Sequence, residues 1–127
     1  MDGAKIDTGL TEAVQRYCHA LHFADVAALD ALCDARFLMH SVGSDGQPRV
    51  TDKAAFTARV GGRKPFAGAP VFKVLSVDVS DEIAQVKLNV TVPPRVFTDQ
   101  LGFFRVGGEW RLVTKLFRVA SGPAMEG

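Results

Sequence analysis

Tyr17, His40 and Lys115 are the side chains of this sequence best suited to acid–base chemistry, and they fall in three separate segments. A histidine changes its charge near neutral pH, and a tyrosine hydroxyl can donate a hydrogen bond to a developing oxyanion. A buried lysine can hold an acidic or enolic ligand or transfer a proton. A small isomerase, dehydratase or cyclase is therefore one hypothesis for this chain.

Each of the three also has a purely structural interpretation. His40 is the only histidine in a predicted strand, and a lone strand histidine is more often a structural residue than a catalyst. Tyr17 is equally well explained as a core tyrosine with a satisfied hydroxyl. Lys115 can instead reach the mouth of a pocket and remain solvated, with its stem packed on Phe117.

The remaining reactive residues indicate neither a metal site nor a disulfide. His19 and His22 share the polar face of the first predicted helix, where we expect them to be exposed and without a third ligand. Cys18 and Cys33 lie among apolar residues of predicted helices, and one pair makes no disulfide framework. We expect two buried thiols in a reducing, cytoplasmic environment, no metal and no cofactor.

Composition limits the partners of the chain. Its 127 residues are 47% apolar and 23% charged, and the formal net charge is +1 with no basic arm, so nucleic-acid binding is not expected. The start lacks a signal-like apolar core, and no run approaches the ~20 apolar residues that span a bilayer. We predict one domain over residues 1–127, ordered over about 8–120, with no membrane partner.

Apolar spacing predicts three helices near the N-terminus and strands after them. The first predicted helix begins near Thr8 or Thr11, either of which could be its N-cap. Asp25 and Asp52 are the predicted N-caps of the second and third helices, and Gly61-Gly62 ends the third. Predicted strands follow at residues 36–42, 71–79 and 83–92 and in a hairpin from Phe97, with residues 43–48 as a loop. This order predicts an α+β fold in which three N-terminal helices pack into a curved, mainly antiparallel sheet.

The last hairpin turns at Gly107-Gly108, where both central positions of a two-residue loop need positive φ. An unbroken register pairs Phe103 with Leu112, Gly102 with Val113, and Gln100 with Lys115. Each hairpin face then carries aromatic residues, so we expect both to be covered. The helices would cover one face, and a second copy of the chain would cover the outer face of Leu101, Phe103, Trp110 and Leu112, giving a homodimer. Arg105 is expected to stack on Trp110.

Three stretches together resemble the nuclear transport factor 2-like superfamily: the helix joint "HFADVAALDALC", the strand "DARFLMH" and the terminal "FTDQLGFFRVGGEWRLVTKLF". The last is most similar to its lumazine-binding-like subgroup. The resemblance covers about residues 8–120 and implies a cystatin-like cone with an apolar pocket, as in SnoaL-like and ketosteroid isomerase-like proteins. The subgroup implies a pteridine-like ligand, although fold does not determine function.

Ketosteroid isomerase is the best-defined catalytic template of that superfamily, and it uses a first-helix tyrosine, a late-strand acid and a first-strand aspartate. Tyr17 matches the tyrosine, but residues 39–41 contain no carboxylate. The late-strand acid aligns with Gly102. Asp99 has the opposite strand parity, so we expect it to face away and either cap the strand start or pair with Arg95 or Arg118. The same alignment implies that the hairpin face opposite to Asp99, which carries Gly102, Phe104 and Lys115, points into the cone. The implied ligand-binding residues are Tyr17, Phe56, Phe104, Val113, Lys115 and Phe117.

Three hypotheses remain open at this point. The leading one is a small-molecule-binding homodimer whose pocket takes an apolar or aromatic ligand and approaches ~300 Å³. The alternative is an acid–base enzyme that uses His40, Tyr17 and Lys115, which requires His40 to face the pocket. The third is a structural module whose cavity is filled by its own phenylalanines, namely Phe37, Phe56, Phe66, Phe72 and Phe104.

Overall fold

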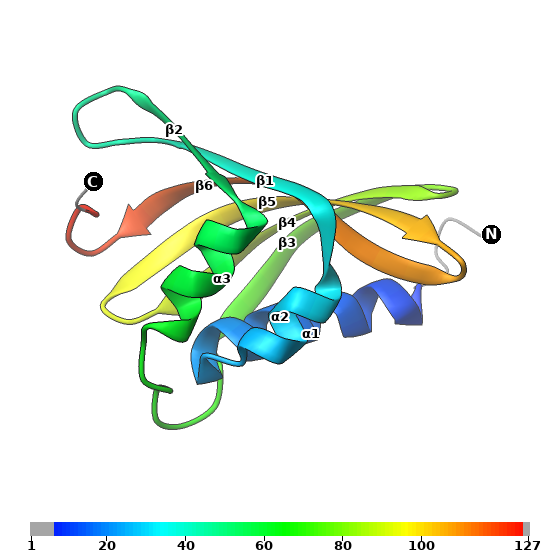
Figure 1. The fold of residues 1–127 in the computed structure, drawn as a ribbon, viewed down its shortest axis with the longest axis horizontal. Helices are drawn as coiled ribbons and strands as arrows, with labels where there is room; N and C mark the ends of the chain where they lie inside the picture. Colours follow the sequence, from blue (N-terminus) through cyan, green and yellow to red (C-terminus); the bar gives the residue numbers. More distant parts are fainter. Residues whose placement is uncertain (1–6, 126–127) are drawn as a thin grey trace.

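The computed structural model describes residues 7–125 as three helices packed on one face of a curved six-stranded sheet (Figure 1). The elements are α1 (Thr8–Phe23), α2 (Val26–Leu32), β1 (Cys33–Val42), β2 (Pro48–Asp52), α3 (Lys53–Gly61), β3 (Phe72–Ser80), β4 (Ile83–Val92), β5 (Arg95–Val106) and β6 (Glu109–Ser121). The strand order is β2-β1-β6-β5-β4-β3, and only β1 and β6 run parallel. The predicted α+β fold is confirmed.

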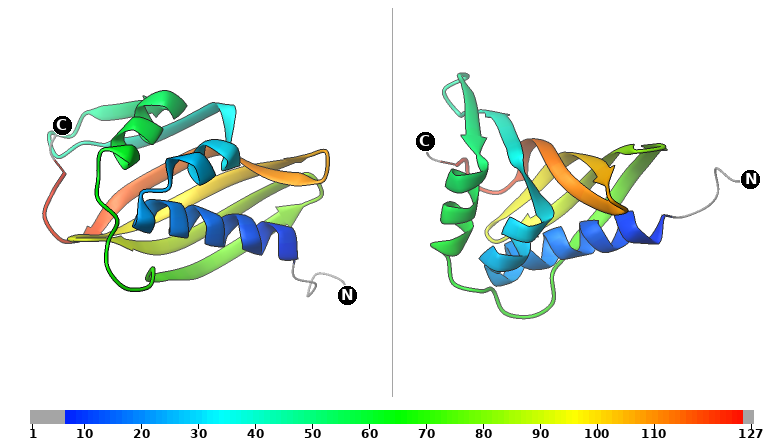
Figure 2. Two further views of the ribbon diagram at one scale, coloured as in Figure 1. Left: turned by 60° about the horizontal axis from the view of Figure 1, so that its bottom comes forward. Right: turned by 45° about the vertical axis from the view of Figure 1, so that its right-hand side comes forward.

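All three helices of the described chain lie on the concave side of the sheet (Figure 2). α1 runs beneath the strands, and α3 descends from the β1–β2 end. Buried apolar side chains from α1, α2, β1, β4, β5 and β6 fill the space between helices and sheet. Within the described residues, no helix is long and apolar enough to cross a membrane.

An aspartate begins each helix. The side chains of Asp7, Asp25 and Asp52 accept hydrogen bonds from backbone N–H groups in the first turns of α1, α2 and α3. The last two were predicted, but the prediction that Thr8 or Thr11 caps α1 is wrong. Asp7 also accepts a hydrogen bond from Trp110 Nε1 at 3.1 Å and thus ties the helix start to the last hairpin. The Arg105 guanidinium lies 4.9 Å from the Trp110 ring centroid, which confirms the predicted stacking.

β2 was not predicted, because its residues carry no hydrophobic alternation. "PRVTD" contains one large apolar side chain, Val50, which is 62% exposed. The segment pairs with β1 at the edge of the sheet and buries no face. Periodicity reports burial, so an edge strand without a buried side leaves little signal in the sequence.

The hairpin of β5 and β6 has the predicted turn but not the predicted register. Gly107 and Gly108 both have positive φ, and Phe103 pairs with Leu112 as expected. Gly102 then pairs with Thr114, which leaves Val113 as an extra residue in β6. From Gly102 back to Phe97 every pair is shifted by one residue, so Lys115 faces Leu101 and the predicted pairing with Gln100 is wrong.

The bulge decides which side chains face the helices, because a shift of one residue exchanges the faces of a strand. On the concave side β5 buries Asp99, Leu101 and Phe103, and β6 buries Trp110, Leu112 and Lys115. The assignment of Leu101, Phe103, Trp110 and Leu112 to an outer, dimer-forming face is therefore wrong, since these residues belong to the core. Phe104 is only half-buried, with the Arg36 guanidinium 5.7 Å from its ring centroid.

Candidate functional site

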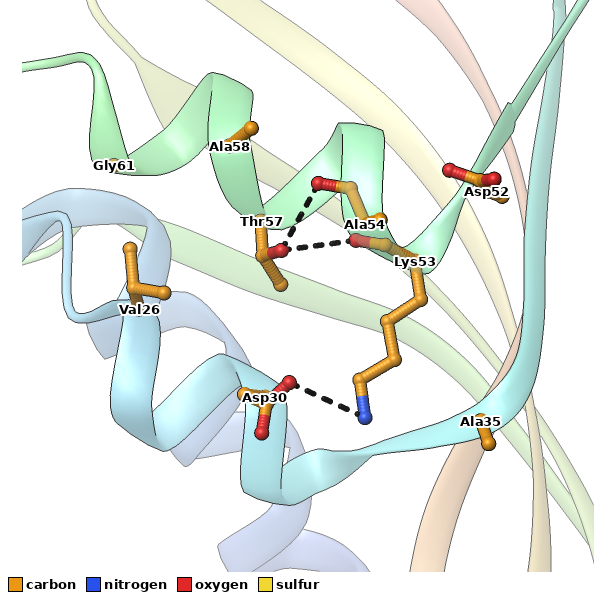
Figure 3. Close-up of a pocket in the computed structure, with 9 residues that line it drawn as sticks. All are labelled: Val26, Asp30, Ala35, Asp52, Lys53, Ala54, Thr57, Ala58 and Gly61. Atoms are coloured by element: carbon orange, nitrogen blue, oxygen red, sulfur yellow. Dashed lines mark hydrogen bonds and ion pairs between the residues drawn. The ribbon is translucent and has the colours of Figure 1, made fainter.

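One hollow of the described structure is an open groove of about 650 Å³ between α2 and α3 (Figure 3). Its polar groups already have partners within the protein. Lys53 Nζ lies 3.3 Å from Asp30 Oδ1 and donates to the carbonyl oxygen of Cys33, and Thr57 Oγ1 donates to the carbonyl oxygens of Lys53 and Ala54. Because its polar groups are already paired and the groove is open, this surface has few groups that could bind a small ligand.

The second hollow, of about 250 Å³, lies inside the cone. It is formed by α3, the turn between β4 and β5, and the C-terminal segment, which lie at the end of the sheet opposite the β5–β6 turn (Figure 1). Apolar side chains make most of its wall, including Met39, Phe56, Phe97 and Phe117. The rings of Phe97 and Phe117 meet edge to face with centroids 5.9 Å apart. We call this hollow the interior pocket.

Lys115 enters the interior pocket from β6, immediately after the bulge region, and is 7% exposed. Its ammonium nitrogen lies 4.7 Å from the ring centroid of Phe56, 5.0 Å from that of Phe117 and 5.3 Å from that of Tyr17. Burial lowers the pKa of Lys115, and the Asp99 carboxylate, 3.8 Å away, opposes that shift. The three ring faces favour the charged form by cation–π attraction.

Asp99 and Tyr17 form a buried pair beside this ammonium. The Tyr17 hydroxyl, on α1, donates a hydrogen bond to Oδ2 of Asp99, on β5. The other carboxylate oxygen, Oδ1, is buried and has no hydrogen-bond partner in the described part of the chain. Burial, reinforced by the Asp99 charge, raises the pKa of Tyr17 well above its usual value, so the hydroxyl stays a neutral donor.

The expectation for Asp99 is thus wrong on both counts. It faces the helices, and it pairs with Tyr17 and Lys115 rather than with Arg95 or Arg118. Asp99 and Gly102 do have opposite parity in β5, but the face of Asp99 is the inner one, and the bulge at Val113 places Lys115 of β6 on that same face. Tyr17 and the strand residue Asp99 are therefore in contact. At the position where ketosteroid isomerase has its first-strand base, this chain has the apolar Met39.

His40 does not reach the interior pocket. It is exposed on β1, between Val50 of β2 and Leu116 of β6, while its neighbour Met39 lines the pocket. The enzyme hypothesis loses the histidine that was to be its base. His22, which was expected on an exposed face, is 5% exposed, and its Nε2 lies 3.1 Å from the carbonyl oxygens of Ala67 and Gly68.

Of the predicted ligand-binding residues, Lys115, Phe56 and Phe117 line the interior pocket. Tyr17 lies behind the wall, against Asp99 and Lys115. Phe104 and Val113 are not among the lining residues. No cluster of three or more His, Cys, Asp or Glu side chains that could hold a metal occurs within residues 7–125.

Three lining arginines were not predicted: Arg59 on α3, Arg63 just after it, and Arg95 at the start of β5. Arg59 and Arg63 are four positions apart, which corresponds to about one helical turn, but α3 ends at Gly61 and Arg63 lies just beyond it. Arg95 donates to the carbonyl oxygens of Pro123 and Ala124 and so holds the C-terminal segment, whose Met125 lines the pocket. The sequence signal was the arginine spacing, but nothing local related it to β5 or β6.

Comparison with known proteins gives one family and many similar folds. The model of a family described as "putative lumazine-binding" matches residues 5–118. A nuclear transport factor 2-like protein of unknown function from Silicibacter pomeroyi has 24% identity and a TM-score of 0.81, with 88% of this chain and 93% of that chain covered. Another such protein, from Shewanella baltica, has 14% identity and a TM-score of 0.83, with 91% and 94% covered. No curated protein matches the sequence. At these identities, the structural neighbours show the fold alone.

Proposed function

This chain belongs to the putative lumazine-binding family of the nuclear transport factor 2-like superfamily, and we propose that it binds one small planar molecule in the interior pocket. One observation carries the proposal. Asp99 and Arg63 line this pocket, and Oδ1 of Asp99 and one terminal nitrogen of Arg63 are buried without a hydrogen-bond partner within residues 7–125. Unpaired buried polar atoms are costly, so a ligand that pairs with them would gain affinity.

The size and walls of the pocket support a planar ligand of one or two rings. Its volume of about 250 Å³ is close to the ~300 Å³ at the small end of ligand sites. Phe56, Phe97 and Phe117 are among the residues that line it. The pocket combines mostly apolar walls with a few polar groups, as is typical of small-molecule sites.

The presence of this pocket also argues against the hypothesis of a structural module whose cavity is filled by its own phenylalanines. Two of the phenylalanines that were to fill the cavity, Phe37 and Phe56, stack on one another with centroids 5.3 Å apart. A third, Phe104, does not line the pocket. A hollow remains beside Lys115 and Asp99, which a filled core would not have.

An acid–base enzyme remains the second candidate because Tyr17, Asp99 and Lys115 are in contact. In such an enzyme, the neutral Tyr17 hydroxyl would support Asp99, and Lys115 would take the proton-transfer role first considered for His40. The pKa of Lys115 is lowered by its burial, which favours that role. Ligand binding needs no change of protonation at any of the three groups, so we place it first.

Native mass spectrometry of the purified protein tests the proposal directly, by detecting a small molecule bound at one copy per chain. A titration with lumazine and other one- and two-ring fluorescent probes complements it. Met39→Trp fills the pocket, whereas His40→Trp adds the same bulk to the exposed neighbouring position of β1. We expect Met39→Trp to abolish probe binding and His40→Trp to preserve it, with thermal unfolding as the check on folding. Unchanged binding to a folded Met39→Trp variant would rule out this pocket.

A further inference from the structure

The charged side chains that line the interior pocket are mostly cationic. Arg59, Arg63, Arg95 and Lys115 lie around it, and among the described residues that line it Asp99 is the only acidic one. The chain as a whole has a formal net charge of only +1. The cations come from α3, β5 and β6 and the segment after α3, so the fold concentrates positive charge at this place.

The Lys115 ammonium has hydrogen-bonding capacity left over. A lysine ammonium carries three N–H donors. Among the described residues it makes no hydrogen bond, since Asp99 Oδ2 is 3.8 Å away and the other neighbours are the rings of Tyr17, Phe56 and Phe117. The rings stabilise its charge but accept none of its protons in the way an anion would.

Arg63, which also lines the pocket, likewise has an unused donor. One of its terminal nitrogens is buried without a partner in residues 7–125, and its guanidinium lies 5.7 Å from the ring centroid of Phe66. Burial lowers the pKa of Arg63, and the nearby Arg59 charge adds to this effect. Arg95 differs, because it already donates to two carbonyl oxygens of the C-terminal segment. Lys115 and Arg63 are therefore the cations with donors to spare.

The unpaired oxygen of Asp99 adds a second requirement. Oδ2 already accepts a hydrogen bond from Tyr17, whereas the buried Oδ1 lacks a donor within the described chain. An N–H or O–H group of a ligand would complete it. A cationic ligand would meet four positive side chains, and a neutral hydrocarbon would leave both the cations and Oδ1 unpaired.

This inference rests on the proposed function. We propose that the ligand of this pocket is a planar aromatic acid. Its anionic group lies between Lys115 and Arg63, and another group of the same ligand donates a hydrogen bond to Asp99. The ring system packs against Phe56, Phe97 and Phe117. The anion supplies the acceptor that both cations lack, and it reduces the mutual repulsion of Arg59, Arg63 and Lys115. Carboxylate is the simplest such group, and the site recognises its charge and oxygen acceptors.

The test uses 6-hydroxy-2-naphthoate and 6-hydroxy-2-naphthamide, which have the same ring system and the same hydroxyl donor for Asp99 and differ in charge. Isothermal titration calorimetry on the full chain is expected to give naphthoate roughly tenfold or more higher affinity, because hydrogen bonds to charged partners are the strong ones. Arg63→Gln and Lys115→Met should each reduce that preference several-fold and leave the affinity for naphthamide nearly unchanged. Arg118→Gln, an exposed position on β6, is the matched control for general electrostatics.

The outcomes distinguish the proposed acid class of the ligand from ligand binding itself. Equal affinity for the two probes would overturn the acid class while leaving ligand binding intact. Binding of neither probe would contradict the proposed function and this inference together. A preference for naphthoate that Arg118→Gln lowers as much as Arg63→Gln does would overturn the assigned position of the anion. If Lys115→Met does not fold, Arg63→Gln alone decides the question, since Arg63 is only half-buried.

Discussion

The hydroxyl of Tyr17 donates a hydrogen bond to Asp99 across 82 positions of sequence, and both residues are 0% exposed. This bond joins α1 to the middle of the sheet. Lys115 contacts both partners, with its ammonium 5.3 Å from the Tyr17 ring centroid and 3.8 Å from Asp99 Oδ2. The three side chains form one network at the inner wall of the interior pocket, so a change in one must alter the surroundings of the others.

Tyr17→Phe should lower the free energy of unfolding by about 1–3 kcal/mol, because it leaves the buried Asp99 carboxylate without its hydroxyl donor. Urea unfolding of Tyr17→Phe, Asp99→Asn and the double variant measures the coupling between the two residues. We expect the double variant to lose clearly less than the sum of the single losses. Strict additivity would contradict a direct interaction.

Tyr17 is the only tyrosine of the chain, so the absorbance of tyrosinate reports on it alone. Since burial and Asp99 raise its pKa in the folded protein, the native chain should show no tyrosinate at about pH 10, where an unfolded tyrosine ionises. The corresponding stabilisation is fully present below about pH 10 and is lost as the pH rises through the folded pKa. A spectrophotometric titration in buffer and in urea checks this. A native transition near pH 10 would be inconsistent with the buried pair.

Cys18 and Cys33 should be unreactive in the folded protein. Both are free and buried, and burial raises the pKa of Cys18 to about 12 and that of Cys33 to about 11. The thiolate is the reactive form, so at pH 8 we expect slow reaction with a thiol-specific disulfide reagent. Denaturant should expose both thiols at once and serves as the positive control. Rapid labelling of the native chain would argue against this burial.

Gly122→Ala should loosen the C-terminal segment that closes the interior pocket. Gly122 has φ +99°, and a Cβ there would lie 2.6 Å from the carbonyl oxygen of Pro94. Gly46→Ala is the matched control, because Gly46 has φ +80° but open space around it. We expect stopped-flow measurements to show faster dissociation of a bound probe from Gly122→Ala than from Gly46→Ala. Equal rates in the two variants would mean that the segment does not restrict the pocket.

The convex face of the sheet remains our expected homodimer interface, with different residues from those first assigned to it. Leu38 on β1 and Leu116 on β6 are 42% and 53% exposed. We expect sedimentation velocity at micromolar concentration to show a dimer, and Leu116→Arg to shift it to the 13.7 kDa monomer. Val77→Arg, at a position 55% exposed that pairs with the core residue Val86, is the control. A monomeric parent chain would end the proposal.

The helix starts show which structural features can be predicted from a few neighbouring residues. Asp25 and Asp52 were identified as N-caps because a capping carboxylate acts on backbone N–H groups within its own first turn. The Gly107-Gly108 turn was identified for a similar reason, since both residues need positive φ. These interactions span only a few residues, so sequence alone determined them. The resemblance of the whole pattern then led to the correct fold.

The inner face of the last hairpin was decided by tertiary structure. An unbroken register satisfied the local pattern of β5 and β6 as well as the bulged one, so residue types could not reveal the extra residue at Val113. The packing of Leu101, Phe103 and Leu112 under the helices distinguishes the two, because it needs these side chains on the same face as Asp99 and Lys115. Sequence by itself determined the three helices, the strands other than β2 and the Gly107-Gly108 turn, and the family resemblance indicated Lys115 as a pocket residue. Tertiary structure alone brought Asp99 to Tyr17, turned His40 outward, and gathered arginines from separate elements, because burial and charge pairing between distant segments leave no local trace.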